Sequence, residues 1–220
     1  MSFVSNGVSM ETLNVWAKVL TQCNNPLGLT EETRVDSLEV CPPKEYKGAE
    51  FIERVLVPRS FLRYNPEEQP RDKNNDQDHV NNLINNYEVS GYLLECPPPI
   101  ACFDYENNSD CHLKGQSGYN RNEALDRIGQ DCYFIDIYRY DSTYWEVVAR
   151  NKSNHHSNPS LAQKWTDYVK EVCNAVDAGI ITSKSDSIDE FVDLIASDKT
   201  TKVRRKIKDT CYNNCQVFPN

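Results

Sequence analysis

The stretch CHLKGQSGYNRNEALDRIG, from Cys111 to Gly129, decides the fold that we expect for this chain. It reads as a strand, a turn with two glycines and a helix that ends at a third glycine. The helical part begins at Arg121 and continues with apolar residues at the i, i+3, i+4 and i+7 spacing of one helix face. We therefore predict a strand, a turn and a helix in direct succession.

This arrangement is typical of a loop that binds phosphate. Its glycines allow a close approach of the backbone, and the N–H groups at a helix start favour anions. Arg121 would add a charged fork for phosphate oxygens. The expected phosphate or nucleotide site comprises Gly115, Gln116, Ser117, Gly118, Tyr119, Asn120 and Arg121. The alternative is an ordinary turn, because Gly-x-x-Arg is short enough to arise by chance.

The neighbouring segments predict alternating strands and helices. Phe51–Val57 and Ile100–Phe103 are apolar enough for strands, and Cys132–Tyr140 is rich in aromatic and β-branched residues. Between the first two, apolar residues from Val80 to Tyr87 follow helical spacing. The chain therefore combines strands with helices in an α+β pattern.

This order of elements resembles the N-terminal domain of the ParB/sulfiredoxin superfamily, over about 51–150. The motifs VLVPRSFLRYNPEEQPR, GYLLECPPPI and GYNRNEAL are similar to the family's segment ending in Asn-Pro-Arg, its Gly-x-x-x-Pro-Ile element and its Gly-x-x-Arg-x-x-Ala box. The resemblance implies an α+β fold with a mixed sheet. It also adds Arg71, the last residue of the first motif, to the phosphate site.

The resemblance implies several activities, which the residues separate in part. Sulfiredoxins carry a reactive cysteine directly after the box glycine, where this chain has Tyr119, so sulfiredoxin chemistry is not expected. Nucleotide-hydrolysing ParB proteins have a Glu-Asn-x-x-Arg helix. Here Glu146 and Arg150 keep that spacing while Val147 replaces the amide. These two residues would join the nucleotide site, or would form a plain i,i+4 ion pair.

Other members of the superfamily are nucleases, and we expect a ParB-like nuclease that hydrolyses phosphodiesters in DNA, with Mg²⁺ or Mn²⁺ as a possible cofactor. Its candidate catalytic residues are Arg121, His112, Asp104 and Asp136. Asp136 interrupts an apolar strand, where an unpaired buried carboxylate would be costly, unless it points outward from a solvated face. The alternative function is a DNA-binding or nucleotide-binding protein without nuclease activity, with NTP or CTP in the same pocket.

The flanking segments are expected to be helical. Residues 1–50 form an N-terminal extension of helix and loop, and 151–220 form a small all-helical module. In this module Ser187 to Glu190 predict a capping box, and a last helix is expected at about 201–213. That helix carries a possible DNA-binding face of Lys202, Arg204, Arg205, Lys206 and Lys208. The alternative is a solvated basic helix.

Composition limits these hypotheses. The formal net charge of −9 over 220 residues argues against general adhesion to nucleic acid, so DNA would be contacted locally. Nine cysteines at irregular spacings, behind an N-terminus too polar for a secretion signal, favour a reduced cytoplasm. Cys173 is expected as a small core residue, and Cys211 and Cys215 are close enough in sequence to touch. No apolar run is long enough to span a membrane.

Overall fold

The computed structural model describes residues 7–36, 45–65, 77–92, 98–104, 111–155 and 164–215. Their contacts group into two compact units, one that reaches Tyr140 and one that begins at Asp141. The helix expected within the ParB-like domain around Glu146 therefore belongs to the second unit. Among the described residues, no helix combines the length and the apolar character needed to cross a membrane.

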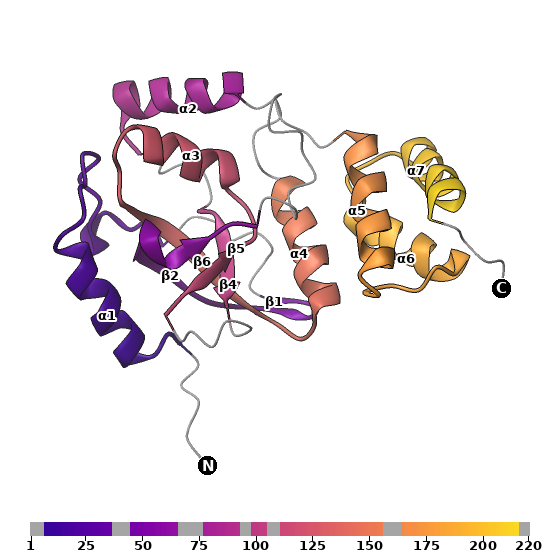
Figure 1. Ribbon diagram of the computed structural model, residues 1–220, viewed down its shortest axis with the longest axis horizontal. Coiled ribbons are helices and arrows are strands. Elements are labelled where there is room, and N and C mark those ends of the chain that lie inside the picture. Colours follow the sequence, from indigo (N-terminus) through magenta and orange to yellow (C-terminus); the bar gives the residue numbers. More distant parts are fainter. Residues whose placement is uncertain are drawn as a thin grey trace, which may run out of the picture. The chain divides into compact units, whose positions relative to one another are not determined.

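The first unit is built on a mixed sheet of six strands in the order β1-β2-β6-β4-β5-β3 (Figure 1). The strands are β1 (Glu45–Tyr46), β2 (Ala49–Pro58), β3 (Leu62–Arg63), β4 (Ile100–Phe103), β5 (Leu113–Gly115) and β6 (Cys132–Tyr140). β6 runs antiparallel to β2 and parallel to β4. The α+β fold with a mixed sheet, which the sequence predicts, is thus confirmed.

β6 lies inside the sheet because its sequence is apolar on both faces. Residues 132–138 of this strand are all buried. A strand covered on both sides needs such a continuous run, and β-branched and aromatic side chains pack well on a pleated surface. β6 therefore forms the centre of the core, with Ile135 and Ile137 fully buried.

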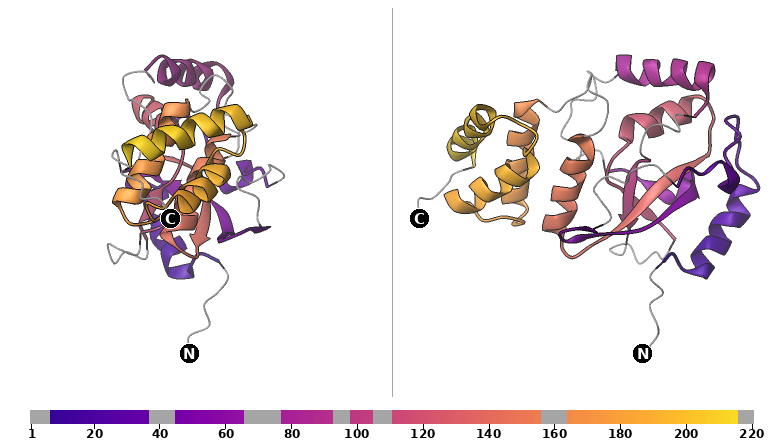
Figure 2. Two further views of the ribbon diagram at one scale, coloured as in Figure 1. Left: turned by 90° about the vertical axis from the view of Figure 1, so that its right-hand side faces the viewer. Right: turned by 180° about the vertical axis from the view of Figure 1, so that it is seen from behind.

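Among the described residues, the α-helices of this unit are α1 (Met10–Leu20), α2 (Gln77–Ser90) and α3 (Tyr119–Arg127). α2 and α3 pack against each other, as both figures show, and α1 packs on β2 (Figures 1 and 2). Trp16 of α1 is 1% exposed and its indole nitrogen donates to the carbonyl of Cys111 at 3.0 Å. The N-terminal segment is thereby joined to the sheet.

The second unit consists of the helices α4 (Thr143–His155), α5 (Trp165–Asp177), α6 (Ser185–Ile195) and α7 (Thr201–Asn214). The last helix was expected within one residue of these bounds. α6 instead begins two residues before the expected capping box, because Lys184, whose backbone is extended, is the N-cap of the helix. Cys173 of α5 is joined to Cys215 by a disulfide, so it is not merely a small core residue.

Candidate anion-binding site

The turn between β5 and α3 requires glycine at position 118. Gly118 caps α3 with φ +87°, in the left-handed region that side chains disfavour. A Cβ atom there would also come within 2.5 Å of the Pro99 side chain. The turn is therefore held against the entry to β4, and the chain enters α3 in one conformation.

Gln116 and Ser117 are used to hold this turn. Both backbone amides donate to the carbonyl of Ile100, at 2.8 and 3.3 Å. The hydroxyl of Ser117 accepts the amide of Ile100 at 3.1 Å, and Gln116 is only 1% exposed. These two residues belong to the expected phosphate site, but their backbone amides already donate to the carbonyl of Ile100 in β4. The part of the loop suited to an anion is thereby narrowed to Gly118 and the first turn of α3.

The side chain of Tyr64 packs against the turn that precedes α3. Its ring occupies the space beside Gly115, where a Cβ atom would lie 2.4 Å from it. Its hydroxyl donates to the carbonyl of Ser117 at 3.0 Å and lies 3.2 Å from the hydroxyl of Tyr133. Burial raises the pKa of Tyr64, only partly offset by the bond to Tyr133 and the charge of Arg121. Tyr64 therefore remains a neutral donor.

Arg121 lies in the first turn of α3 and is half-buried. Its positive charge acts on the hydroxyl of Tyr64, which lies under the same turn. The ring of Tyr119 meets the ring of Tyr64 edge to face, with centroids 5.9 Å apart. Arg121, the start of α3 and the ring of Tyr119 thus all lie within three residues of Gly118.

Arg59 anchors α3 along its length. Its Nε donates to Asn122 at 3.1 Å, its Nη2 to Asp126 at 2.7 Å and its Nη1 to the carbonyl of Gln130 at 3.3 Å. Asn122 also accepts from Tyr133 at 3.3 Å. Arg59, Asn122 and Tyr133 carry no local sequence signal for this role, because they meet through contacts distant along the chain.

His112 and Asp104 lie together, away from Gly118. The amide of Asp104 donates to the carbonyl of His112 at 2.9 Å, and Arg63 is 3.9 Å from the carboxylate of Asp104. β4 pairs antiparallel with β5, so this pair lies at one end of the two strands and the Gly118 turn at the other. The structure therefore does not bring these candidate catalytic residues to Arg121.

Asp136 does not point outward into solvent. It is fully buried, and its two oxygens accept from Nε and Nη2 of Arg54 at 2.6 and 2.8 Å. Burial opposes the charge of Arg54, but the bonds and charge of Asp136 prevail and raise the pKa of Arg54. Asp136 is thus one half of an ion pair inside the sheet. Its partner Arg54 offsets the free energy that burial of a lone carboxylate in an apolar strand would cost.

Two of the remaining nucleotide-site candidates, Glu146 and Arg150, belong to the second unit. Arg150 is 7% exposed and pairs with Glu171 of α5, which ties α4 to α5. Glu146 lies in the first turn of α4. Arg71 lies outside the described residues.

In the part of the chain that the structure describes, no three His, Cys, Asp or Glu side chains group as metal ligands. A Mg²⁺ or Mn²⁺ cofactor stays a prediction.

The basic residues of α7 are largely engaged within the helical unit. Lys208 lies 2.9 Å from Asp193, and Arg204 lies 3.8 Å from the same carboxyl group. Lys206 lies 3.8 Å from the ring centroid of Trp165. Lys202, Arg205 and Lys206 are exposed. DNA binding through α7 stays a prediction, which would rest chiefly on these three cations.

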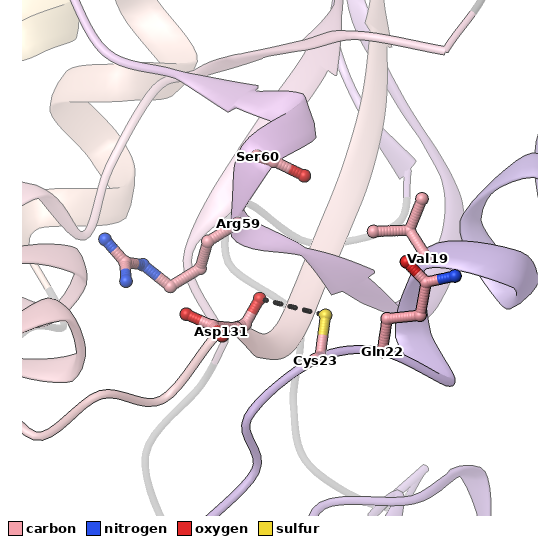
Figure 3. A pocket seen from close by; sticks show the side chains of 6 residues that line it. All are labelled: Val19, Gln22, Cys23, Arg59, Ser60 and Asp131. Atoms are coloured by element: carbon pink, nitrogen blue, oxygen red, sulfur yellow. Dashed lines mark hydrogen bonds between the residues drawn. The ribbon is translucent and has the colours of Figure 1, made fainter.

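A separate pocket of about 410 Å³ opens where α1 ends (Figure 3). Its lining residues are Val19, Gln22, Cys23, Arg59, Ser60 and Asp131. The thiol of Cys23 donates to the carbonyl of Asp131 at 3.7 Å. Burial, followed by the charge of Asp131, raises the pKa of Cys23, which lowers the fraction of its thiolate at neutral pH.

No family model matches the sequence, and no curated protein matches it. Two solved structures are similar to the chain. A Pnob8-like ParB-N domain is 13% identical with a TM-score of 0.48, over 76% of this chain and 70% of that chain. The second structure, the C-terminally truncated chromosome-partitioning protein ParB from Caulobacter crescentus complexed with CTP-gamma-S, is 15% identical with a TM-score of 0.37, over 75% of this chain and 89% of that chain.

The sequence motifs predict a ParB-like fold, and both of these similar structures are ParB structures. Identities of 13% and 15% indicate no ligand for this chain. What the site binds must therefore be inferred from its own residues.

Proposed function

We propose that the first turn of α3 binds the phosphate groups of a nucleotide and that the protein acts as a nucleotide-binding module without nuclease activity. The observation that carries the proposal is the left-handed Gly118 at the start of a nine-residue helix, with Arg121 in its first turn. A helix start and a guanidinium both favour a negatively charged group.

The site has the chemistry of an anion receptor. A charge-assisted hydrogen bond from an arginine to a phosphate contributes about 1.5 to 3 kcal/mol, and the helix dipole adds up to about 1 kcal/mol. Tyr64 and Ile100 hold the turn through Ser117, so the arrangement is fixed before a ligand arrives. The half-buried ring of Tyr119 offers an apolar face next to the phosphate position.

The positions of the other candidate catalytic residues favour nucleotide binding over phosphodiester hydrolysis. Metal-assisted cleavage of a phosphodiester needs carboxylates that converge on the scissile phosphate. Asp104 and His112 lie at the far end of β4 and β5, and Asp136 is held by Arg54. Binding to DNA through α7 would rely chiefly on the exposed Lys202, Arg205 and Lys206, because Arg204 and Lys208 lie close to the carboxylate of Asp193.

Calorimetric titration with CTP, ATP, GTP and UTP, with and without Mg²⁺, tests the proposal. We expect binding of at least one nucleotide, weakened about 10-fold to 100-fold by Arg121→Ala. Arg127→Ala is the matched control, since Arg127 lies on the same helix but pairs with Glu123 and Gln77 at its other end. It should bind like the wild type.

Two outcomes would contradict the proposal. Nucleotide affinity that is equal in the wild type and Arg121→Ala would remove the site from the first turn of α3. Cleavage of plasmid DNA with Mg²⁺ or Mn²⁺, lost in Asp104→Asn or His112→Ala, would instead support the nuclease that the sequence resemblance implies.

A further inference from the structure

Three cysteines converge in the helical unit. Cys173 of α5 and Cys215, which follows the last residue of α7, form a disulfide with their Cα atoms 5.6 Å apart. Cys211 lies one turn earlier on α7, is fully buried and is sensitive to the side chain of Cys215. A potential nucleophile thus lies one helical turn from a disulfide, which is the arrangement that thiol–disulfide exchange needs.

We propose that Cys211 is an exchange thiol for the Cys173–Cys215 disulfide. Cys211 gives its proton to solvent and its thiolate attacks the sulfur of Cys215. The bond between Cys215 and Cys173 breaks, and Cys173 leaves as a thiolate that takes up a proton. One S–S bond forms as another breaks, so no oxidant or reductant is consumed.

The two forms differ in what the disulfide joins. The Cys173–Cys215 bond ties α5 to the end of α7, whereas a Cys211–Cys215 bond lies within the end of α7 itself. Residues four apart on a helix are neighbours, and Cys215 already follows the last helical residue, so only the final turn has to adjust. Exchange therefore releases the covalent tie between α5 and the basic helix α7.

The fold restrains this exchange at neutral pH. Cys211 is fully buried, and burial raises the pKa of its thiol to about 12. The sulfurs of Cys173 and Cys215 lie near this thiol but carry no proton while they form the disulfide, and the carboxylate of Asp177 is the charged group that acts on Cys215. Below this pKa the thiolate fraction rises about tenfold with each unit of increasing pH, so exchange accelerates with pH or when the end of α7 opens.

Mass-spectrometric mapping of tryptic peptides tests the proposal, with thiols trapped by acid and alkylation after incubation without reductant. Cleavage after Lys170, Lys184 and Lys208 separates peptide 171–184, which holds Cys173, from peptide 209–220, which holds Cys211 and Cys215. The starting form gives the two peptides cross-linked. The exchanged form gives peptide 209–220 with an internal disulfide and peptide 171–184 with an alkylated cysteine.

We expect the exchanged peptides to accumulate in the wild type, about 100-fold faster at pH 9 than at pH 7. Cys211→Ser and Cys211→Ala should keep only the cross-linked pair, and Cys111→Ser, in the other unit, should behave like the wild type. Circular dichroism establishes that the variants are folded. A wild-type map that stays unchanged at both pH values, or exchange that persists without Cys211, would overturn the proposal.

Discussion

The hydroxyl of Tyr64 donates to the carbonyl of Ser117 at 3.0 Å, one residue before the left-handed Gly118. The two residues are 53 positions apart in the sequence. The bond fixes the peptide from which α3 departs, so the position of the expected anion site depends on a side chain outside the Gly-x-x-Arg motif.

Tyr64→Phe should lower the free energy of unfolding by about 1 to 2 kcal/mol, because the carbonyl of Ser117 loses a buried donor while the ring remains. Nucleotide affinity should fall as well. A double-mutant cycle with Tyr133→Phe, followed by urea unfolding, separates the shared hydrogen bond from the packing of the rings. Strictly additive effects would contradict a coupled pair.

Gly118→Ala should destabilise the protein and abolish nucleotide binding, since the new Cβ would lie 2.5 Å from Pro99 in a left-handed backbone. The backbone alone accounts for about 1 to 2 kcal/mol. Gly91→Ala is the matched control, because Gly91 has φ +73° and a Cβ atom added there would meet nothing within 4 Å. Equal losses in the two variants, measured by urea unfolding, would show that contact with Pro99 is unimportant.

Asp136→Asn should lower the free energy of unfolding by about 3 to 5 kcal/mol, because it leaves the buried charge of Arg54 without its counter-ion. Replacing both residues, as Arg54→Met with Asp136→Leu, should restore much of this loss. Arg139→Met on the same strand breaks an exposed pair with Glu50 and should cost less than about 1 kcal/mol. Denaturant unfolding of all three variants checks the order.

Stability should also fall at alkaline pH through Cys132. Burial, assisted by Cys23 and Asp131, raises the pKa of this thiol from 9.0 to about 11. Below pH 9 the folded and unfolded thiols are both neutral, and the contribution is fully present. From about pH 9 to 11 only the unfolded chain loses the proton, so the free energy of unfolding falls by up to about 1.4 kcal/mol per pH unit.

Cys132→Ala removes this titration and should show a smaller loss between about pH 9 and pH 11 than the wild type. Its stability at neutral pH should be lower, because the thiol is 2% exposed and packs in the core. Thermal unfolding across the pH range measures both effects. Parallel stability curves for the two proteins would rule out Cys132 as the titrating group.

Local patterns predicted much of this fold. The apolar spacing after Val80 and after Arg121 indicated α2 and α3, and the aromatic run of β6 indicated a buried strand. Each signal resides in neighbouring residues, which experience the same helix or strand geometry. The order of these elements then indicated a ParB-like sheet.

The ion pairs and the disulfide could not be predicted in this way. Asp136 reads as an isolated acid until Arg54, 82 residues away, is placed beside it. Cys173 and Cys215 are 42 residues apart, and nothing in their spacing indicates the pairing. Ser187 begins a good capping motif, yet α6 starts at Ser185, directly after the extended backbone of Lys184. Such choices depend on tertiary contacts, which local propensity does not contain.

The contact of Gly118 with Pro99 has a consequence for the speed of recognition. A turn wedged against a proline ring has little freedom to lose, so an incoming phosphate would not have to order it first. Association would then be governed by diffusion and by the field of Arg121, and a slow, ligand-independent isomerisation step should be missing from stopped-flow traces.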